Sequence, residues 1–116
     1  MKNKNPKDLV ECIKYLLKNS ENLEDFKKGK EDIISLYHHT TGRGIRNEWG
    51  LWDEKSKLHQ FFKSIGIWHA DDISGIILTT LHRILNHKQV RLKEQVEYYQ
   101  KYWKTITLPD MKIKGI

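Results

Sequence analysis

One segment of the sequence concentrates side chains that could bind or transform a ligand. Residues 38–52 hold two adjacent histidines, two arginines, three glycines and two tryptophans. A guanidinium group offers planar, paired donors that suit a phosphate or a carboxylate. If a helix continues through the segment, Arg43 and Arg46 lie three residues apart on one face and can converge on one anion. The spacing therefore predicts an anion-binding site.

A second dense segment, His-Ala-Asp-Asp-Ile-Ser-Gly, follows at residues 69–75. We interpret the two segments as the walls of one pocket, in which the arginines hold phosphates, an indole stacks on a base and Asp72 contacts a ribose or a base edge. The candidate ligand-binding residues are the polar and aromatic side chains of the two segments, namely His39, Arg43, Arg46, Asn47, Trp49, Trp52, His69 and Asp72.

Each of these residues also has a purely structural explanation. Arginines on a helix face are often solvated or paired with nearby carboxylates, and a tryptophan commonly anchors a core. Asp71 is a natural N-cap for the helix that follows it, with Ser74 three residues later in the manner of a capping box. Under this alternative the conspicuous residues hold the fold together, and the chain works as a protein-interaction domain of the inhibitor or immunity type.

Metal binding and catalysis find less support in the sequence. Adjacent helical residues point about 100° apart, so His38 and His39 do not readily chelate one metal. No familiar zinc spacing, Ser or Cys nucleophile motif or phosphate-cradling loop is visible. We predict no metal, no cofactor and no catalytic residue. A His/Asp-dependent enzyme acting on a nucleotide stays as the weakest alternative.

Length and composition place the chain among small helical proteins. Its 116 residues predict one helical domain over 1–116, with 1–4 and 104–116 flexible or extended. The net charge of +6 favours anionic partners, but the lysines are scattered, so nucleic acid ranks below a small molecule or a protein. No apolar run approaches the roughly 18–20 residues of a membrane span. The single Cys12 fits a buried position and a reducing cytoplasm.

Apolar residues recur at helical spacing through most of the chain. The first helix should begin at Asn5 and Pro6, and a third should run from about residue 31 past Gly42 and Gly44. Each of these glycines costs a helix about 1 kcal/mol, so we expect them to permit close packing or ligand access. Further helices are expected at 23–28, 57–64, 73–85 and 88–103. The predicted fold is all-α, a compact single-domain bundle of about five helices with an extended C-terminal tail.

Three motifs resemble a bacterial and phage domain family of unknown function, DUF6794. They are the segments GRGIRNEWGLW at 42–52, GIWHADDISGIIL at 66–78 and YYQKYW at 98–103. Ala70 departs mildly from the family pattern, which usually has a proline or similar residue before the paired aspartates. The resemblance is clearest from Tyr37 to Trp103. It implies a small helical domain and a setting in phage–host conflict, but it supplies no activity.

The residues themselves therefore carry the functional prediction. The favoured hypothesis is a non-enzymatic binding protein whose Arg/His/Trp pocket takes an anionic small molecule such as a nucleotide. The protein-interaction domain is the alternative, and the sequence leaves the choice between the two open. The oligomeric state has no signature in the sequence.

Overall fold

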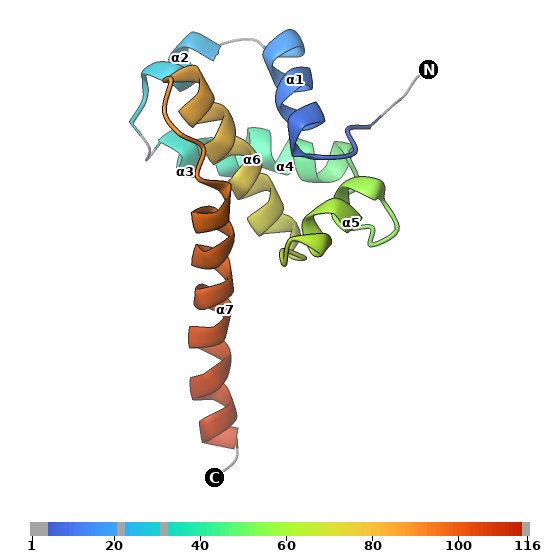
Figure 1. Ribbon diagram of the computed structural model, residues 1–116, viewed down its shortest axis with the longest axis vertical. Helices are drawn as coiled ribbons and strands as arrows, with labels where there is room; N and C mark the ends of the chain where they lie inside the picture. Colours follow the sequence, from blue (N-terminus) through green and yellow to red (C-terminus); the bar gives the residue numbers. More distant parts are fainter. Residues whose placement is uncertain (1–4, 21–22, 31–32, 115–116) are drawn as a thin grey trace.

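The computed structural model describes residues 5–20, 23–30 and 33–114, and the side chains of these residues except 35, 39 and 105–114. These ranges contain seven helices and no strand, which confirms the all-α prediction. The helices are α1 (Leu9–Asn19), α2 (Leu23–Lys28), α3 (Ile33–His39), α4 (Thr41–Glu48), α5 (Lys57–Ser64), α6 (Ala70–Leu85) and α7 (Leu92–Lys114) (Figure 1).

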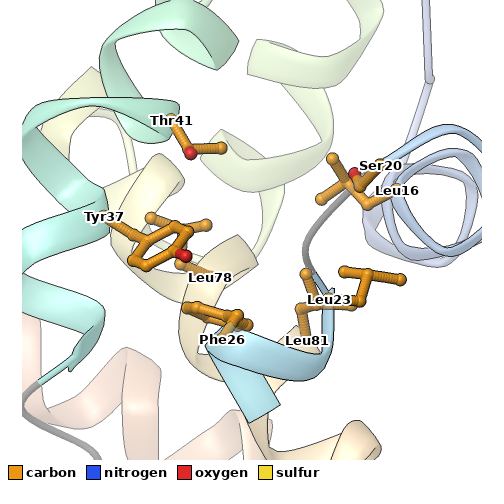
Figure 2. A pocket seen from close by; sticks show the side chains of 8 residues that line it. All are labelled: Leu16, Ser20, Leu23, Phe26, Tyr37, Thr41, Leu78 and Leu81. Atoms are coloured by element: carbon orange, nitrogen blue, oxygen red, sulfur yellow. The ribbon is translucent and has the colours of Figure 1, made fainter. Parts of the chain in front are cut away.

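Helix α6 is the centre of the fold. Each of the other six helices packs against it (Figure 1). Its apolar residues face several directions, and Ile73, Ile76 and Ile77 have no exposed surface. A helix that is hydrophobic over most of its circumference is stable only when neighbours cover it, and here short amphipathic helices do so. On one side, α1, α2, α3 and α6 leave an apolar pocket between them (Figure 2).

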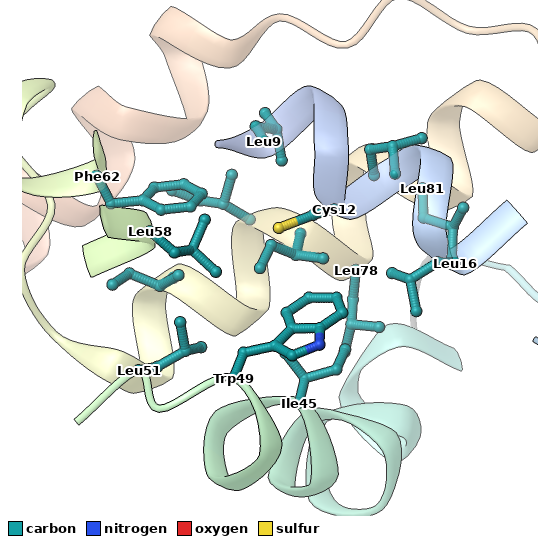
Figure 3. Close-up of a cluster of buried hydrophobic side chains, with 14 of the residues drawn as sticks. Leu9, Cys12, Leu16, Ile45, Trp49, Leu51, Leu58, Phe62, Leu78 and Leu81 are labelled. Carbon is teal, nitrogen blue, oxygen red and sulfur yellow. The ribbon is translucent and has the colours of Figure 1, made fainter. Parts of the chain in front are cut away.

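The core fills the space between α6 and its neighbours (Figure 3). Cys12 lies inside it without exposed surface, and burial raises the pKa of its thiol, so this cysteine is an inert core residue. Trp49 is 3% exposed and packs edge-on against Tyr15 at a centroid distance of 5.7 Å. Trp49 therefore anchors the core.

Two helix starts differ from those predicted. The N-cap of α1 is Asp8, whose side chain accepts a hydrogen bond from the Glu11 amide, three residues after the expected Asn5. The N-cap of α6 is His69, whose Nδ1 accepts from the Asp71 amide, so the assignment of Asp71 as N-cap was wrong. Since α6 begins earlier than expected, Asp71 lies in its first turn, where a carboxylate favours the helix dipole and is free for another partner.

The expected third helix is broken at Thr40 into α3 and α4. The Thr40 amide donates to the Tyr37 carbonyl three residues back, which tightens and ends α3. Gly42 follows in α4, where a Cβ would lie 3.2 Å from Nη1 of Arg46 and 3.5 Å from Cδ1 of Leu78. Gly42 thus permits the close packing against α6 that the sequence predicted, whereas Gly44 has nothing within 4 Å of a Cβ.

Helix α7 packs its first half along α6 and then projects away from the other helices (Figure 1). Its backbone is helical to Lys114, where the sequence predicted an extended tail from residue 104. The stretch between Trp103 and Pro109 holds no helix breaker, whereas Pro109 lacks the N–H of a helical hydrogen bond although the backbone stays helical beyond it. Among the described residues, no helix is both long enough and apolar enough to cross a membrane.

Candidate functional site

Arg46 lies in the interface between α4 and α6, with 10% of its side chain exposed. Its Nη1 donates to Oγ of Ser74 at 2.8 Å, and its Nε lies 3.3 Å from Oδ1 of Asp71. The Ser74 hydroxyl in turn donates to the Asp71 carbonyl at 3.0 Å. We call His38, Arg46, Asp71 and Ser74 the Arg46 network.

His38 completes this network from α3. Its Nε2 lies 3.5 Å from Nη1 of Arg46. Because a guanidinium only donates, Nε2 has to be the acceptor in this contact.

The hydrogen bonding of the Arg46 network makes it scaffold rather than catalytic machinery. Ser74 donates its proton to the Asp71 carbonyl and accepts from Arg46, so among the described residues its hydroxyl is engaged in holding the network. The guanidinium is turned toward α6 and already faces a carboxylate. Arg46 therefore joins α4 to α6, and its hydrogen bond and ion pair offset the free-energy cost of burying its charge.

A second polar cluster lies where α7 crosses the start of α6. Nε1 of Trp103 donates to Oδ2 of Asp72 at 2.7 Å, and the ring of His69 stacks on the Trp103 indole with centroids 5.0 Å apart. Burial raises the pKa of the Asp72 carboxyl, while the Trp103 hydrogen bond and the nearby imidazoles of His69 and His38 oppose that shift. This cluster fastens α7 to α6 through a buried carboxylate.

A cleft of about 670 Å³ opens beside the two clusters, between α3, α6 and α7. We call it the α7 cleft; it is lined by Ile34, His38, Gly75, Thr79, Arg83, Glu94, Gln95, Tyr98 and Tyr99. Gly75 permits its shape, because a Cβ there would lie 2.6 Å from the Tyr99 hydroxyl. Burial, reinforced by Asp72, raises the pKa of Tyr99 to about 12, so this phenol stays a hydrogen-bond donor at neutral pH.

The cleft continues into a basic hollow at the α6–α7 loop. Arg83 lines the cleft and also a neighbouring hollow of about 340 Å³ formed with Lys88, Gln89 and Arg91. Three cationic side chains thus lie at this end, with Glu94 as the acidic residue of the lining. The Arg91–Glu94 ion pair is 3.4 Å long, and both side chains are more than half exposed, so it competes weakly with an incoming anion.

The loop between α6 and α7 is held firmly in place. Arg83 and Gln95 both donate to the Val90 carbonyl, at 2.7 and 2.9 Å, and Asn86 donates to the Lys27 carbonyl at 3.1 Å. His87 and Arg91 have φ of 58° and 53°, a region that non-glycine residues seldom adopt. These hydrogen bonds stabilise the strained backbone of the loop from which Lys88 and Arg91 project.

The structure brings only part of the predicted site together. Arg46 belongs to the Arg46 network, and His69 and Asp72 belong to the adjoining cluster. Arg43 and Asn47 are exposed on α4, and Trp52 is 60% exposed after it. Trp49 fills the core. The side chain of His39 lies outside the described residues.

Several residues of these clusters were missing from the predicted site. Ser74 and Asp71 had been explained as helix caps, and Tyr99 and Trp103 had been placed only in the expected helix at 88–103. A signal for Trp103 did exist, because an indole needs a partner for its N–H when it is partly buried. Nothing in the sequence pairs residue 72 with residue 103 directly.

The fold and these clusters define an all-helical domain with a buried charged network and an open cleft beside it. The chain belongs to the DUF6794 family, a domain of unknown function, whose profile matches residues 5–85. The match ends with α6, so α7 and the α7 wall of the cleft lie outside it. No curated protein and no solved structure matches the chain. Among the described residues, no group of three or more His, Cys, Asp or Glu side chains is placed to hold a metal ion.

Proposed function

We propose that this protein is a non-enzymatic binding domain that holds an anionic small molecule of the nucleotide class in the α7 cleft. The observation that supports this is the continuity of two surfaces through Arg83. The cleft offers the tyrosine rings of Tyr98 and Tyr99, and the hollow that adjoins it offers Lys88 and Arg91, with Arg83 lining both. A nucleotide has the same two-part character, with a planar base at one end and phosphate at the other.

The cleft and the hollow would supply different contributions to binding. Tyr98 is 65% exposed, so a base can stack on its ring without opening the core, and such stacking contributes about 1–3 kcal/mol. Lys88 and Arg91 are exposed and can close on a phosphate with charge-assisted hydrogen bonds. Thr79 and Gln95 also line the cleft, and their side-chain oxygens can contact a sugar hydroxyl.

Calorimetric titration with AMP, cyclic AMP and UDP-glucose tests the proposal. We expect one of these nucleotides to bind the wild type and Arg91→Glu to weaken it at least about tenfold, since a charge-assisted hydrogen bond contributes about 1.5–3 kcal/mol. The matched control is Arg43→Glu, an equal charge change at an exposed arginine of α4, which should leave affinity unchanged. Loss of binding in Arg43→Glu alone would return the site to the α4 face, and absence of binding by all three nucleotides would overturn the proposal.

A protein-interaction role is the second candidate, and exposed aromatic side chains favour it. Trp68 and Tyr102 are 56% and 48% exposed, and α7 projects beyond the body (Figure 1). Large exposed aromatic residues are typical of interface centres. Capture of a partner protein that Trp68→Ser and Tyr102→Ser abolish, while Arg91→Glu retains it, would favour this role over the cleft.

A further inference from the structure

The pocket between α1, α2, α3 and α6 has a chemical character different from that of the α7 cleft. Its volume is about 210 Å³, and among the described residues no charged side chain lines it (Figure 2). The floor consists of side chains that are each at most 6% exposed: Leu16, Phe26, Leu78 and Leu81. An engineered apolar cavity of about 150 Å³ in another protein stays dry and binds benzene, so this volume is large enough for a single substituted ring.

The rim of the pocket is polar where the floor is not. Ser20, Tyr37 and Thr41 contribute hydroxyl groups from the end of α1, from α3 and from the start of α4 (Figure 2). Within the described part of the chain, none of these three hydroxyls has a hydrogen-bond partner. The pocket therefore presents an apolar interior and, at its mouth, hydroxyl groups that are not bonded to other described residues.

We propose that this pocket is a second binding site, independent of the α7 cleft, for an uncharged and mainly apolar small molecule with one hydrogen-bonding group. The apolar body of the ligand fills the space above Leu78 and Leu81, and its polar group contacts the rim hydroxyls. An anionic ligand is disfavoured because the lining holds no cation to compensate a buried charge. A neutral phenol has this character.

Binding of p-cresol, toluene and benzoate, measured by ligand-observed NMR, tests the charge and polarity of the ligand. The wild type should bind p-cresol about two- to tenfold more tightly than toluene, the ratio that one net hydrogen bond supplies. Benzoate should bind more weakly than either. Equal affinity for toluene and p-cresol, or affinity for benzoate as high as for p-cresol, would overturn the assignment of the ligand class.

Variants locate the binding. Leu23→Phe and Ser20→Phe each add a ring at the mouth from a different element and should abolish binding of p-cresol and toluene. Leu17→Phe adds the same ring at an exposed position outside the lining and should bind both probes like the wild type. Tyr37→Phe and Thr41→Val each remove one hydroxyl, and at least one of them should abolish the preference for p-cresol over toluene.

Binding is compared only for variants whose thermal unfolding is as cooperative as that of the wild type. Two filling variants are used, so that one can be tested if the other does not fold. Undiminished p-cresol binding in a folded Leu23→Phe or Ser20→Phe protein would place the probe elsewhere and overturn the proposal. Absence of p-cresol and toluene binding by the wild type at millimolar concentration would overturn it as well.

Discussion

The Arg46 network and the α7 cleft both gather charged residues around α6, but their charges are engaged differently. In the network, the buried guanidinium of Arg46 contacts Ser74 and Asp71, and the Ser74 hydroxyl both accepts and donates a hydrogen bond. In the hollow that adjoins the cleft, Lys88 and Arg91 are exposed, and in the cleft the Tyr98 ring is 65% exposed. The comparison shows that the guanidinium of Arg46 is buried and engaged within the protein, whereas Lys88 and Arg91 lie at an open surface, where we propose that a ligand binds.

Removing the guanidinium is expected to have the largest effect on stability. Arg46→Met should lower the free energy of unfolding by about 2–3 kcal/mol, because a charge-assisted hydrogen bond in a buried interface is lost. Asp71→Asn should cost less than about 1 kcal/mol, since half of the Asp71 side chain is exposed to water. Urea unfolding of both variants measures the two losses in free energy of unfolding. Equal and small effects would mean that Arg46 does not hold α4 to α6.

The two glycines of α4 give a matched pair with a smaller difference. Gly44→Ala should raise the free energy of unfolding by about 0.5–1 kcal/mol, because helix propensity improves and the new methyl group meets nothing. Gly42→Ala gains the same propensity, but its Cβ presses on a guanidinium that Ser74 and Asp71 hold in place. We expect Gly42→Ala to be less stable than Gly44→Ala by about 1 kcal/mol or more in urea unfolding. Equal stabilisation by both substitutions would show that the Arg46 side chain moves aside for the new methyl group at little cost.

The buried carboxylate beside the cleft gives a pH-dependent effect. Burial raises the pKa of Asp72 in the folded chain, whereas in the unfolded chain an aspartate has a pKa of about 3.9. As the pH falls, the Asp72 carboxylate of the folded chain therefore becomes protonated first. Ionised Asp72 therefore lowers stability at neutral pH, and this penalty fades as the pH falls through the raised pKa toward that of the unfolded chain.

Asp72→Asn removes the charge and keeps an oxygen that can accept from Trp103. Its thermal midpoint should exceed that of the wild type at pH 7, and the difference should shrink as the pH approaches 4. Glu54→Gln removes one charge from an exposed side chain and serves as the control for net charge. A lower midpoint for Asp72→Asn at pH 7 would mean that the ionised carboxylate stabilises the contact with Trp103.

The helices were predictable because they depend on local periodicity. The bounds of α2 and α5 agree with the prediction, since a clear apolar stripe and a strong stop signal such as Gly29 or Gly66 mark them. The break at Thr40 was missed because the apolar period continues through it and only a three-residue hydrogen bond ends α3. Residues 104–114 were missed because alternating apolar residues also fit an extended chain.

The site was less predictable because it depends on contacts between distant segments. The sequence marked Arg46 and Asp72 as unusual, but Arg46 pairs with the neighbouring Asp71, and Asp72 accepts from Trp103, 31 residues further along the chain. A shift of one residue along α6 turns a side chain by about 100°, so small errors in helix start exchange the roles of adjacent aspartates. No binding site was predicted at the basic loop, because its charges are spread over residues 83–91.

The most direct test of the proposed division between scaffold and site is a ¹H–¹⁵N NMR titration of the wild type with the nucleotide that binds best among AMP, cyclic AMP and UDP-glucose. We predict that the largest amide shifts occur at Thr79, Arg83, Gln95 and Tyr99, with little change from Arg43 to Glu48. Shifts concentrated from Arg43 to Glu48 would contradict this assignment, because they would place the ligand on the α4 face and make the Arg46 region part of the binding site.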